Sequence, residues 1–189
     1  MCSSDLQRLV AVNVSLTTLD HDLKRRMEPR TAGPEQRLRM IRALTDAGVP
    51  TGVLTAPIIP ALNDHELERM LEAAAAHGAV SAGYVLLRLP HEVKALFEEW
   101  LAQHYPDRAE HVLSLIRQMR EGALYDAQYG KRQTGTGPFA GLLQARFRRA
   151  QRAHGLDRGF DLDGSRFRAP RKPSPQLDLL AAEPFQESQ

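Results

Sequence analysis

Two hydroxyl side chains and an arginine follow the first apolar run of the sequence. The valines of residues 9–16 predict a short buried strand, the apolar run stops in Ser15, Thr17 and Thr18, and Asp20 opens an acid-rich helix start. A parallel strand presents its ligand contacts in the loop after its carboxyl end. Hydroxyls there can bind a ribose or a carboxylate, and Arg30 can hold a carboxylate through two parallel hydrogen bonds. The structural alternative is a hydroxyl helix cap beside a solvated arginine.

Two more strand-then-helix units are expected to position these residues. Proline, glycine and hydrophobic periodicity predict the following order: helix 34–47, strand 52–56, apolar loop 56–60, a helix opened by an Asn63–Glu66 capping box, strand 81–87, helices 93–101 and 107–122, and a last helix 139–150. The connections between the strands are too long for hairpins, so the strands should be parallel. The fold class is therefore α/β. Three such units do not close a barrel.

The loop at residues 56–60 is stiff and apolar. Its two prolines remove backbone donors, and Ile58, Ile59 and Pro60 form a wall that suits the flat face of an adenine. The structural alternative is a plug over the end of the sheet. The third strand ends at Arg88 and His91, which suggests a different parallel α/β enzyme that uses His91 in acid–base chemistry.

Composition indicates a cytoplasmic globular protein. The sequence holds 42% hydrophobic residues, one cysteine, no signal peptide and no apolar run of membrane-spanning length. The formal charge of +2 is uneven, because residues 131–172 carry eleven Lys or Arg against three Asp. This basic helix and tail predict a second alternative, a nucleic-acid-binding module. The end of the chain should be mobile.

The order of motifs resembles the second half of a radical S-adenosylmethionine (SAM) protein, in the branch related to spore photoproduct lyase. The matching motifs are Ser15-Leu16-Thr17, Glu28-Pro29-Arg30, Ala56-Pro57-Ile58-Ile59-Pro60 and Asn63-Asp64. The resemblance covers roughly residues 8 to 155. It implies the back half of a partial (β/α)6 TIM-like barrel, with SAM and a [4Fe-4S] cluster as cofactors and an unknown substrate.

The same resemblance assigns roles. It implies that Ser15 and Thr17 meet the ribose or the amino-acid part of SAM, that Arg30 pairs with its carboxylate, and that residues 58–60 line the adenine. The three clustered cysteines that hold the cluster in this family are absent, since the chain has only Cys2. We therefore expect a truncated chain that is inactive alone. The expected divisions are an artefactual or disordered start at 1–7, a partial barrel at 8–122, a loop and C-terminal helix at 123–155, and a basic then acidic flexible tail at 156–189.

Overall fold

A three-stranded parallel sheet organises the molecule. The structure, a computed structural model, describes residues 9–125 and 133–166. Strands β1 (Val12–Ser15), β2 (Thr51–Ile58) and β3 (Ser81–Leu86) lie in the order β1-β2-β3, and both pairs are parallel. The helices are α1 (His21–Met27), α2 (Pro34–Asp46), α3 (Leu67–Ala76), α4 (Val93–His104), α5 (Pro106–Gln118) and α6 (Gly137–Ala153), with short 3-10 turns η2 (Asp64–Glu66) and η3 (Gly164–Arg166). The predicted α/β class and parallel strands are confirmed.

The first two helices begin where the sequence predicts. The carboxylate of Asp20 accepts hydrogen bonds from the backbone N–H groups of Asp22 and Leu23, which caps α1. Pro34 is the first residue of α2, where its missing N–H costs nothing. Gly48 follows that helix with φ at 78°, a left-handed conformation that glycine adopts without strain.

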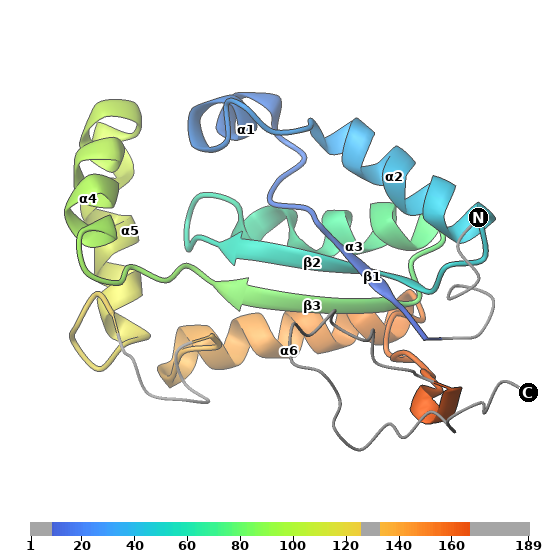
Figure 1. Ribbon diagram of the computed structural model, residues 1–189. Helices are drawn as coiled ribbons and strands as arrows, with labels where there is room; N and C mark the ends of the chain where they lie inside the picture. The colour runs from blue at the N-terminus through green and yellow to red at the C-terminus, as the bar shows by residue number, and fades with distance from the viewer. Residues whose placement is uncertain (1–8, 126–132, 167–189) are drawn as a thin grey trace, which may run out of the picture.

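The helices contribute to two apolar cores, one against the sheet and one beyond its carboxyl end. α2 and α3 pack on one face of β1 and β2, and α6 runs along β3 and contacts α3 (Figure 1). Leu16, Ile41 and Val53 are fully buried in this main core. α4 and α5 stand beyond the carboxyl ends of β2 and β3 (Figure 1), where a second apolar cluster includes Ile59, Leu101 and Ile116. The carboxyl end of the sheet therefore lies between the two cores.

Strand β2 is longer than predicted. The sequence pattern placed its end at residue 56 and a free loop after it, but β2 continues through Pro57 to Ile58. The register with β3 shifts between Thr55 and Ile58, so the proline occupies an irregularity in the ladder, where its missing donor is tolerated. Pairing resumes at Ile58, which lies opposite Leu86. Ile58 is thus a strand residue and not a loop residue.

Segments from the C-terminal part cover the outer edge of β3. The N–H of Leu86 donates to Gln133 O at 2.8 Å, and the N–H of Ala82 donates to Leu156 O at 3.0 Å. Ser81 also forms an isolated antiparallel bridge with Asp157. Leu156 is fully buried, so the folded part of the protein extends beyond residue 155, where the sequence placed the start of a tail. The expected start at residues 1–7 and the tail beyond residue 166 lie outside the described residues.

Within the described ranges, no helix is long and apolar enough to cross a membrane.

Candidate functional site

The two predicted hydroxyls point to the carboxyl end of the central strand. Ser15 Oγ donates to Ala56 O at 3.3 Å, and Thr17 Oγ1 lies 3.2 Å from the same oxygen. Ser15 is exposed, whereas Thr17 is only 2% exposed. The predicted pair therefore meets at one end of the sheet, and the inner member also lies 3.2 Å from Glu28 Oε1. The helix-capping alternative does not apply to these two residues, because Asp20 caps α1.

Arg37 organises this end of the sheet. Its guanidinium donates to Glu28 Oε2 at 2.6 Å, to Ser15 O at 3.0 Å and to Thr17 Oγ1 at 3.3 Å. It also donates to Thr31 Oγ1 at 2.9 Å and, through Nε, to Ala32 O at 3.1 Å. The Arg37 side chain is only 11% exposed, and that of Glu28 is 26% exposed. This sheltered, charge-assisted network links β1, the end of α1 and the start of α2.

Sequence reasoning missed Arg37 but contained a signal for it. Arg37 is the fourth residue of α2, and a cation in the first turn of a helix opposes the helix dipole. Such a residue is expected to have an acidic partner outside its own helix. Glu28, which the sequence analysis treated only as part of a motif, is that partner.

Arg30 lies outside the network. It is exposed, and within the described residues it makes no hydrogen bond or ion pair. Arg30 belongs to the turn between α1 and α2. Thr31 anchors this turn, because its hydroxyl donates to Glu28 O and accepts from Arg37 Nη2. The structure thus presents Arg30 to solvent on an anchored turn, close in sequence to the polar network.

A buried asparagine joins the loops that follow β1 and β2. Asn63 is fully buried, its Oδ1 accepts from Ile59 N at 2.7 Å, and its Nδ2 donates to Thr17 O at 2.8 Å and Pro57 O at 3.0 Å. Glu66, 3% exposed, accepts from the Thr18 hydroxyl and from Leu19 N. The predicted capping box is therefore wrong. Both side chains reach back to the neighbouring loops because η2, and not a helix start, follows Asn63.

The predicted adenine wall is closed to solvent. Ile58 and Ile59 are fully buried, and Pro60 is also buried. Ile58 packs in the main core, while Ile59 packs in the second core beside α4 and α5. Of the three residues, only Ile59 lines a described pocket. The structure therefore brings Ser15 and Thr17 together and separates Ile58 from Ile59.

A bidentate ion pair fastens α6 to this end of the fold. Arg146 donates through Nε and Nη2 to the two carboxylate oxygens of Glu68, each at 2.7 Å, and also to Asp64 O at 2.9 Å. Asp64 in turn accepts from Ala61 N at 2.7 Å. Arg146 lies within the basic segment 131–172 but is not a free cation of that segment, because acidic residues in α3 and η2 engage it. Hydrogen bonding from Arg146 lowers the pKa of Glu68 below its ordinary value.

This pKa shift predicts a pH dependence of stability. A carboxylate with a lowered folded-state pKa stabilises the fold above its unfolded-state pKa, and this contribution is lost as pH falls through the folded-state value. We expect Glu68→Gln to lower the free energy of unfolding at neutral pH, with a difference from wild type that shrinks in acid. Urea unfolding of wild type and variant at neutral pH and at acidic pH measures this difference in the free energy of unfolding. The control is Glu72→Gln, an exposed carboxylate on the same helix. A loss for Glu68→Gln that is equal at both pH values would contradict the assignment.

Arg88 and His91 do not form an acid–base site. Arg88 Nη2 donates to Tyr125 Oη at 3.4 Å, and its Nε is buried without a hydrogen-bond partner. His91 is exposed, and none of the described side chains makes a hydrogen bond or ion pair with its imidazole. No hydrogen bond or ion pair of the described residues orients the His91 imidazole, so the acid–base alternative gains no support from these contacts.

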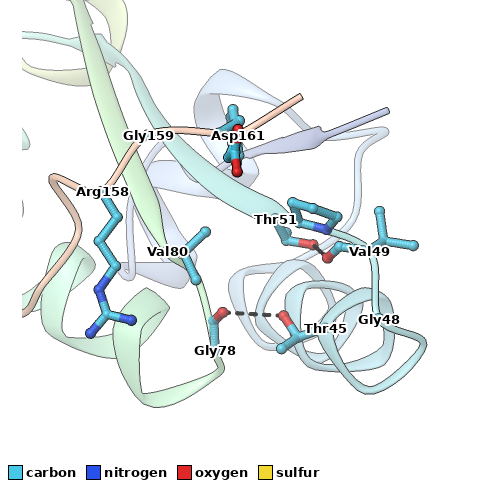
Figure 2. A pocket seen from close by; sticks show the side chains of 11 residues that line it. Thr45, Gly48, Val49, Thr51, Gly78, Val80, Arg158, Gly159 and Asp161 are labelled. Carbon is cyan, nitrogen blue, oxygen red and sulfur yellow. Dashed lines mark hydrogen bonds between the residues drawn. The ribbon is translucent and has the colours of Figure 1, made fainter. Parts of the chain in front are cut away.

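Another pocket lies at the opposite end of the sheet, near the amino ends of β2 and β3. Its volume is about 480 Å³, and turns 48–51 and 78–80 line it together with residues 158–161. Figure 2 shows the hydrogen bond of 3.2 Å from Thr45 to Gly78 O on one side, and Arg158 and Asp161 on the segment that crosses above. In parallel α/β folds ligands bind at the carboxyl ends of the strands, and the amino-terminal end contributes stability. The candidate site is therefore the network around Thr17.

A family model matches part of the sequence. Residues 4–74 match the family described as the Radical SAM superfamily. The matched range includes β1, β2 and the residues of the polar network. No group of three metal-ligating side chains occurs in residues 9–125 and 133–166.

Three curated relatives share 34% identity over 110 residues. They are the uncharacterized proteins Rv2578c and MT2655 of Mycobacterium tuberculosis and Mb2609c of Mycobacterium bovis. The aligned segment covers 57% of this chain and 32% of each relative, so the chain spans about a third of the length of these relatives. No solved structure matches the sequence.

Proposed function

We propose that this chain contributes the SAM-binding wall of a radical SAM enzyme, in the branch related to spore photoproduct lyase. The observation that carries the proposal is the polar network of Thr17, Glu28 and Arg37 at the carboxyl end of β1 and β2. It lies inside the segment that matches the Radical SAM superfamily. The sheet would then be the back half of a partial barrel, and the whole protein would work in the cytoplasm on a substrate still to be identified.

The polar residues divide into anchors and free groups. Arg37 and Glu28 satisfy each other, so they hold the turn that carries Arg30 rather than a ligand. No described residue engages the guanidinium of Arg30, and a guanidinium binds a carboxylate through two parallel bonds. Ser15 Oγ, exposed beside Ala56 O, is the hydroxyl that reaches the ribose or the amino-acid part of SAM. Thr17 supports it from the buried side.

The adenine would lie against the end of β2. Ile58 is buried in the main core, so it would stabilise the end of β2 and would not contact the adenine. Ile59 and Pro60 are buried, so they would support the adenine site from behind and would not form its exposed face, and Asn63 fixes the backbone of Ile59. The adenine edge would meet the backbone of this loop, since apolar side chains offer it no hydrogen bonds.

The cluster of the superfamily does not fit the residues of this chain. A [4Fe-4S] cluster supplies the electron for radical chemistry and needs cysteine thiolates, whereas the sequence contains one cysteine. In the proposal its ligands belong to another part of the whole protein. The residues present here would bind and orient SAM through its carboxyl and sugar groups.

Calorimetric titration of SAM into this chain tests the proposal. We expect Arg30→Ala to weaken binding by about 1.5–3 kcal/mol, because a charge-assisted hydrogen bond to the carboxylate is lost. The matched control is Arg148→Ala, an exposed arginine on α6 far in sequence from the site. Arg146 is unsuitable as a control because it is bonded to Glu68. Equal affinities of the two variants would remove Arg30 from the site.

The basic C-terminal part supports a second candidate, contact with nucleic acid by the whole protein. Arg148, Arg149 and Arg152 are exposed on α6, and Arg146 is excluded from this surface by its ion pair. Binding through such cations would depend on counterion release, so it would weaken steeply as salt rises. The expected basic residues Lys131 and Lys172 lie outside the described residues.

A further inference from the structure

An apolar pocket opens at the carboxyl end of the sheet, between α1, α4 and the residues that directly follow β2 and β3. Its volume is about 240 Å³. All of its lining side chains are apolar or aromatic: Met27, Ile59, Leu87, Val93, Leu96, Phe97 and Trp100. Four of them come from α4, which stands beyond the ends of β2 and β3 (Figure 1). The pocket is therefore a hydrocarbon surface at the end of the sheet where ligands bind.

Two aromatic rings form one wall of this pocket. Phe97 and Trp100 lie nearly parallel, with ring centroids 5.7 Å apart and an interplanar angle of 17°. The indole N–H of Trp100 donates to Arg26 O at 3.1 Å, which uses its single hydrogen-bonding group and fixes its ring. This wall therefore presents only aromatic surface, and no free hydrogen-bonding group, to a bound ligand.

The rim of the pocket leaves large apolar side chains in water. Val93 is 42% exposed and Leu96 is 62% exposed, although both belong to the apolar side of α4. A contiguous exposed apolar surface around a concavity is typical of ligand or partner sites, whereas single exposed apolar residues are common on any protein surface. A guest in this pocket would remove both side chains from water.

We propose that this pocket binds an aromatic hydrocarbon ring of the substrate. A nucleobase is a poor guest, because its edge carries donors and acceptors that this lining cannot satisfy, and burying them unpaired costs free energy. A cavity of roughly 150 Å³ holds a benzene ring, so a pocket of this size takes one ring or two fused rings. The guest has a flat apolar body and keeps its polar groups outside the rim.

The position of the pocket connects it with the proposed SAM site. Met27 immediately precedes Glu28 of the polar network, and Ile59 is held by Asn63, which also bonds Thr17 O. The pocket therefore lies at the same end of the sheet as the proposed SAM site and shares two of its anchoring segments. The inference rests on the proposed function only in calling this guest a substrate.

Fluorescence of the single tryptophan tests the pocket directly. The chain contains one tryptophan, Trp100, in the pocket wall, so a heavy-atom quencher that binds there reduces all the indole emission. The probes are 1-bromonaphthalene and, as a polar-edged ring, 8-bromoadenosine. We expect saturable quenching by 1-bromonaphthalene at concentrations about tenfold or more below those needed for 8-bromoadenosine.

Two variants and a control separate the pocket from nonspecific apolar binding. Leu96→Arg makes the rim polar and Val93→Phe fills the opening, and both positions are exposed enough to accept the change. Each variant should weaken 1-bromonaphthalene quenching about tenfold or more. The control, Leu142→Arg, makes the same change at a leucine that is 58% exposed on α6 and should leave quenching unaltered. Circular dichroism checks that each variant is folded.

The outcomes also separate this inference from the proposed function. Unsaturable quenching, equal quenching by 8-bromoadenosine, or unchanged quenching in both folded pocket variants would overturn the inference. SAM is titrated into the same preparations by calorimetry. Absence of SAM binding with saturable bromonaphthalene quenching would contradict only the proposed function, and the reverse result would contradict only the pocket.

Discussion

Replacement of Asn63 by alanine is expected to lower the free energy of unfolding by about 3–4 kcal/mol. The side chain is fully buried and makes three hydrogen bonds, one accepted from Ile59 N and two donated to Thr17 O and Pro57 O. The variant leaves these backbone groups buried without partners, and each such group carries a desolvation penalty. Because these groups lie in the loop after β1, near the end of β2 and directly after β2, the loss should also loosen the carboxyl end of the sheet.

Urea unfolding of Asn63→Ala and of a control variant at a second asparagine measures this effect. Asn13→Ala changes the same residue type on β1, but Asn13 is exposed, so its effect should stay within about 0.5 kcal/mol. Asn63→Asp keeps an acceptor for Ile59 N and loses both donated bonds, and it should not restore stability. A loss for Asn63→Ala no larger than that for Asn13→Ala would mean that these segments are held by other contacts.

Arg37→Met is expected to destabilise the protein by about 2–3 kcal/mol, because it leaves the Glu28 carboxylate without its sheltered partner. Methionine retains much of the aliphatic stem, so the change removes mainly charge and hydrogen bonds. The turn at residues 28–31 loses its anchor, and SAM affinity should fall with it, although in the proposal Arg37 does not touch the ligand. Arg37 is a positioning residue in this account.

A double-mutant cycle isolates the ion pair. Glu28→Gln, Arg37→Met and the double variant are compared by urea unfolding, and the double variant should be less destabilised than the sum of the two single variants. Arg39→Met, an exposed arginine on the same helix, is the control for loss of a cation from α2. Additive effects of the two single changes would show that Glu28 and Arg37 do not interact energetically.

The fold was largely predictable because its signals are local. Hydrophobic alternation, Pro34 as a first helix residue and glycines after helices define the strand–helix order, and long connections require parallel strands. The extent of β2 was not predictable in this way. Proline normally ends a strand, but β3 lies beside β2 and resumes pairing beyond Pro57 at Ile58, a tertiary contact that local sequence does not contain.

The site was only partly predictable. Ser15 and Thr17 could be placed at a strand end from alternation alone, and the structure brings them together. The partner of Glu28 lies nine residues later, and Asn63 reaches back 46 residues to Thr17. Side chains that act across loops can imitate a local helix cap in sequence, which explains the wrong capping box. Their roles become visible only when the loops are placed side by side.

The amide spectrum of the isotopically labelled chain, recorded by NMR with and without SAM, tests the central claim most directly. The account predicts that SAM shifts amide signals at residues 15–18, in the turn 28–31 around Arg30, and at 59–63. Signals of residues 48–51, 78–80 and 158–161, which line the large pocket at the opposite end of the sheet, should stay unchanged. Shifts confined to that opposite pocket, or no shifts at saturating SAM, would contradict the account.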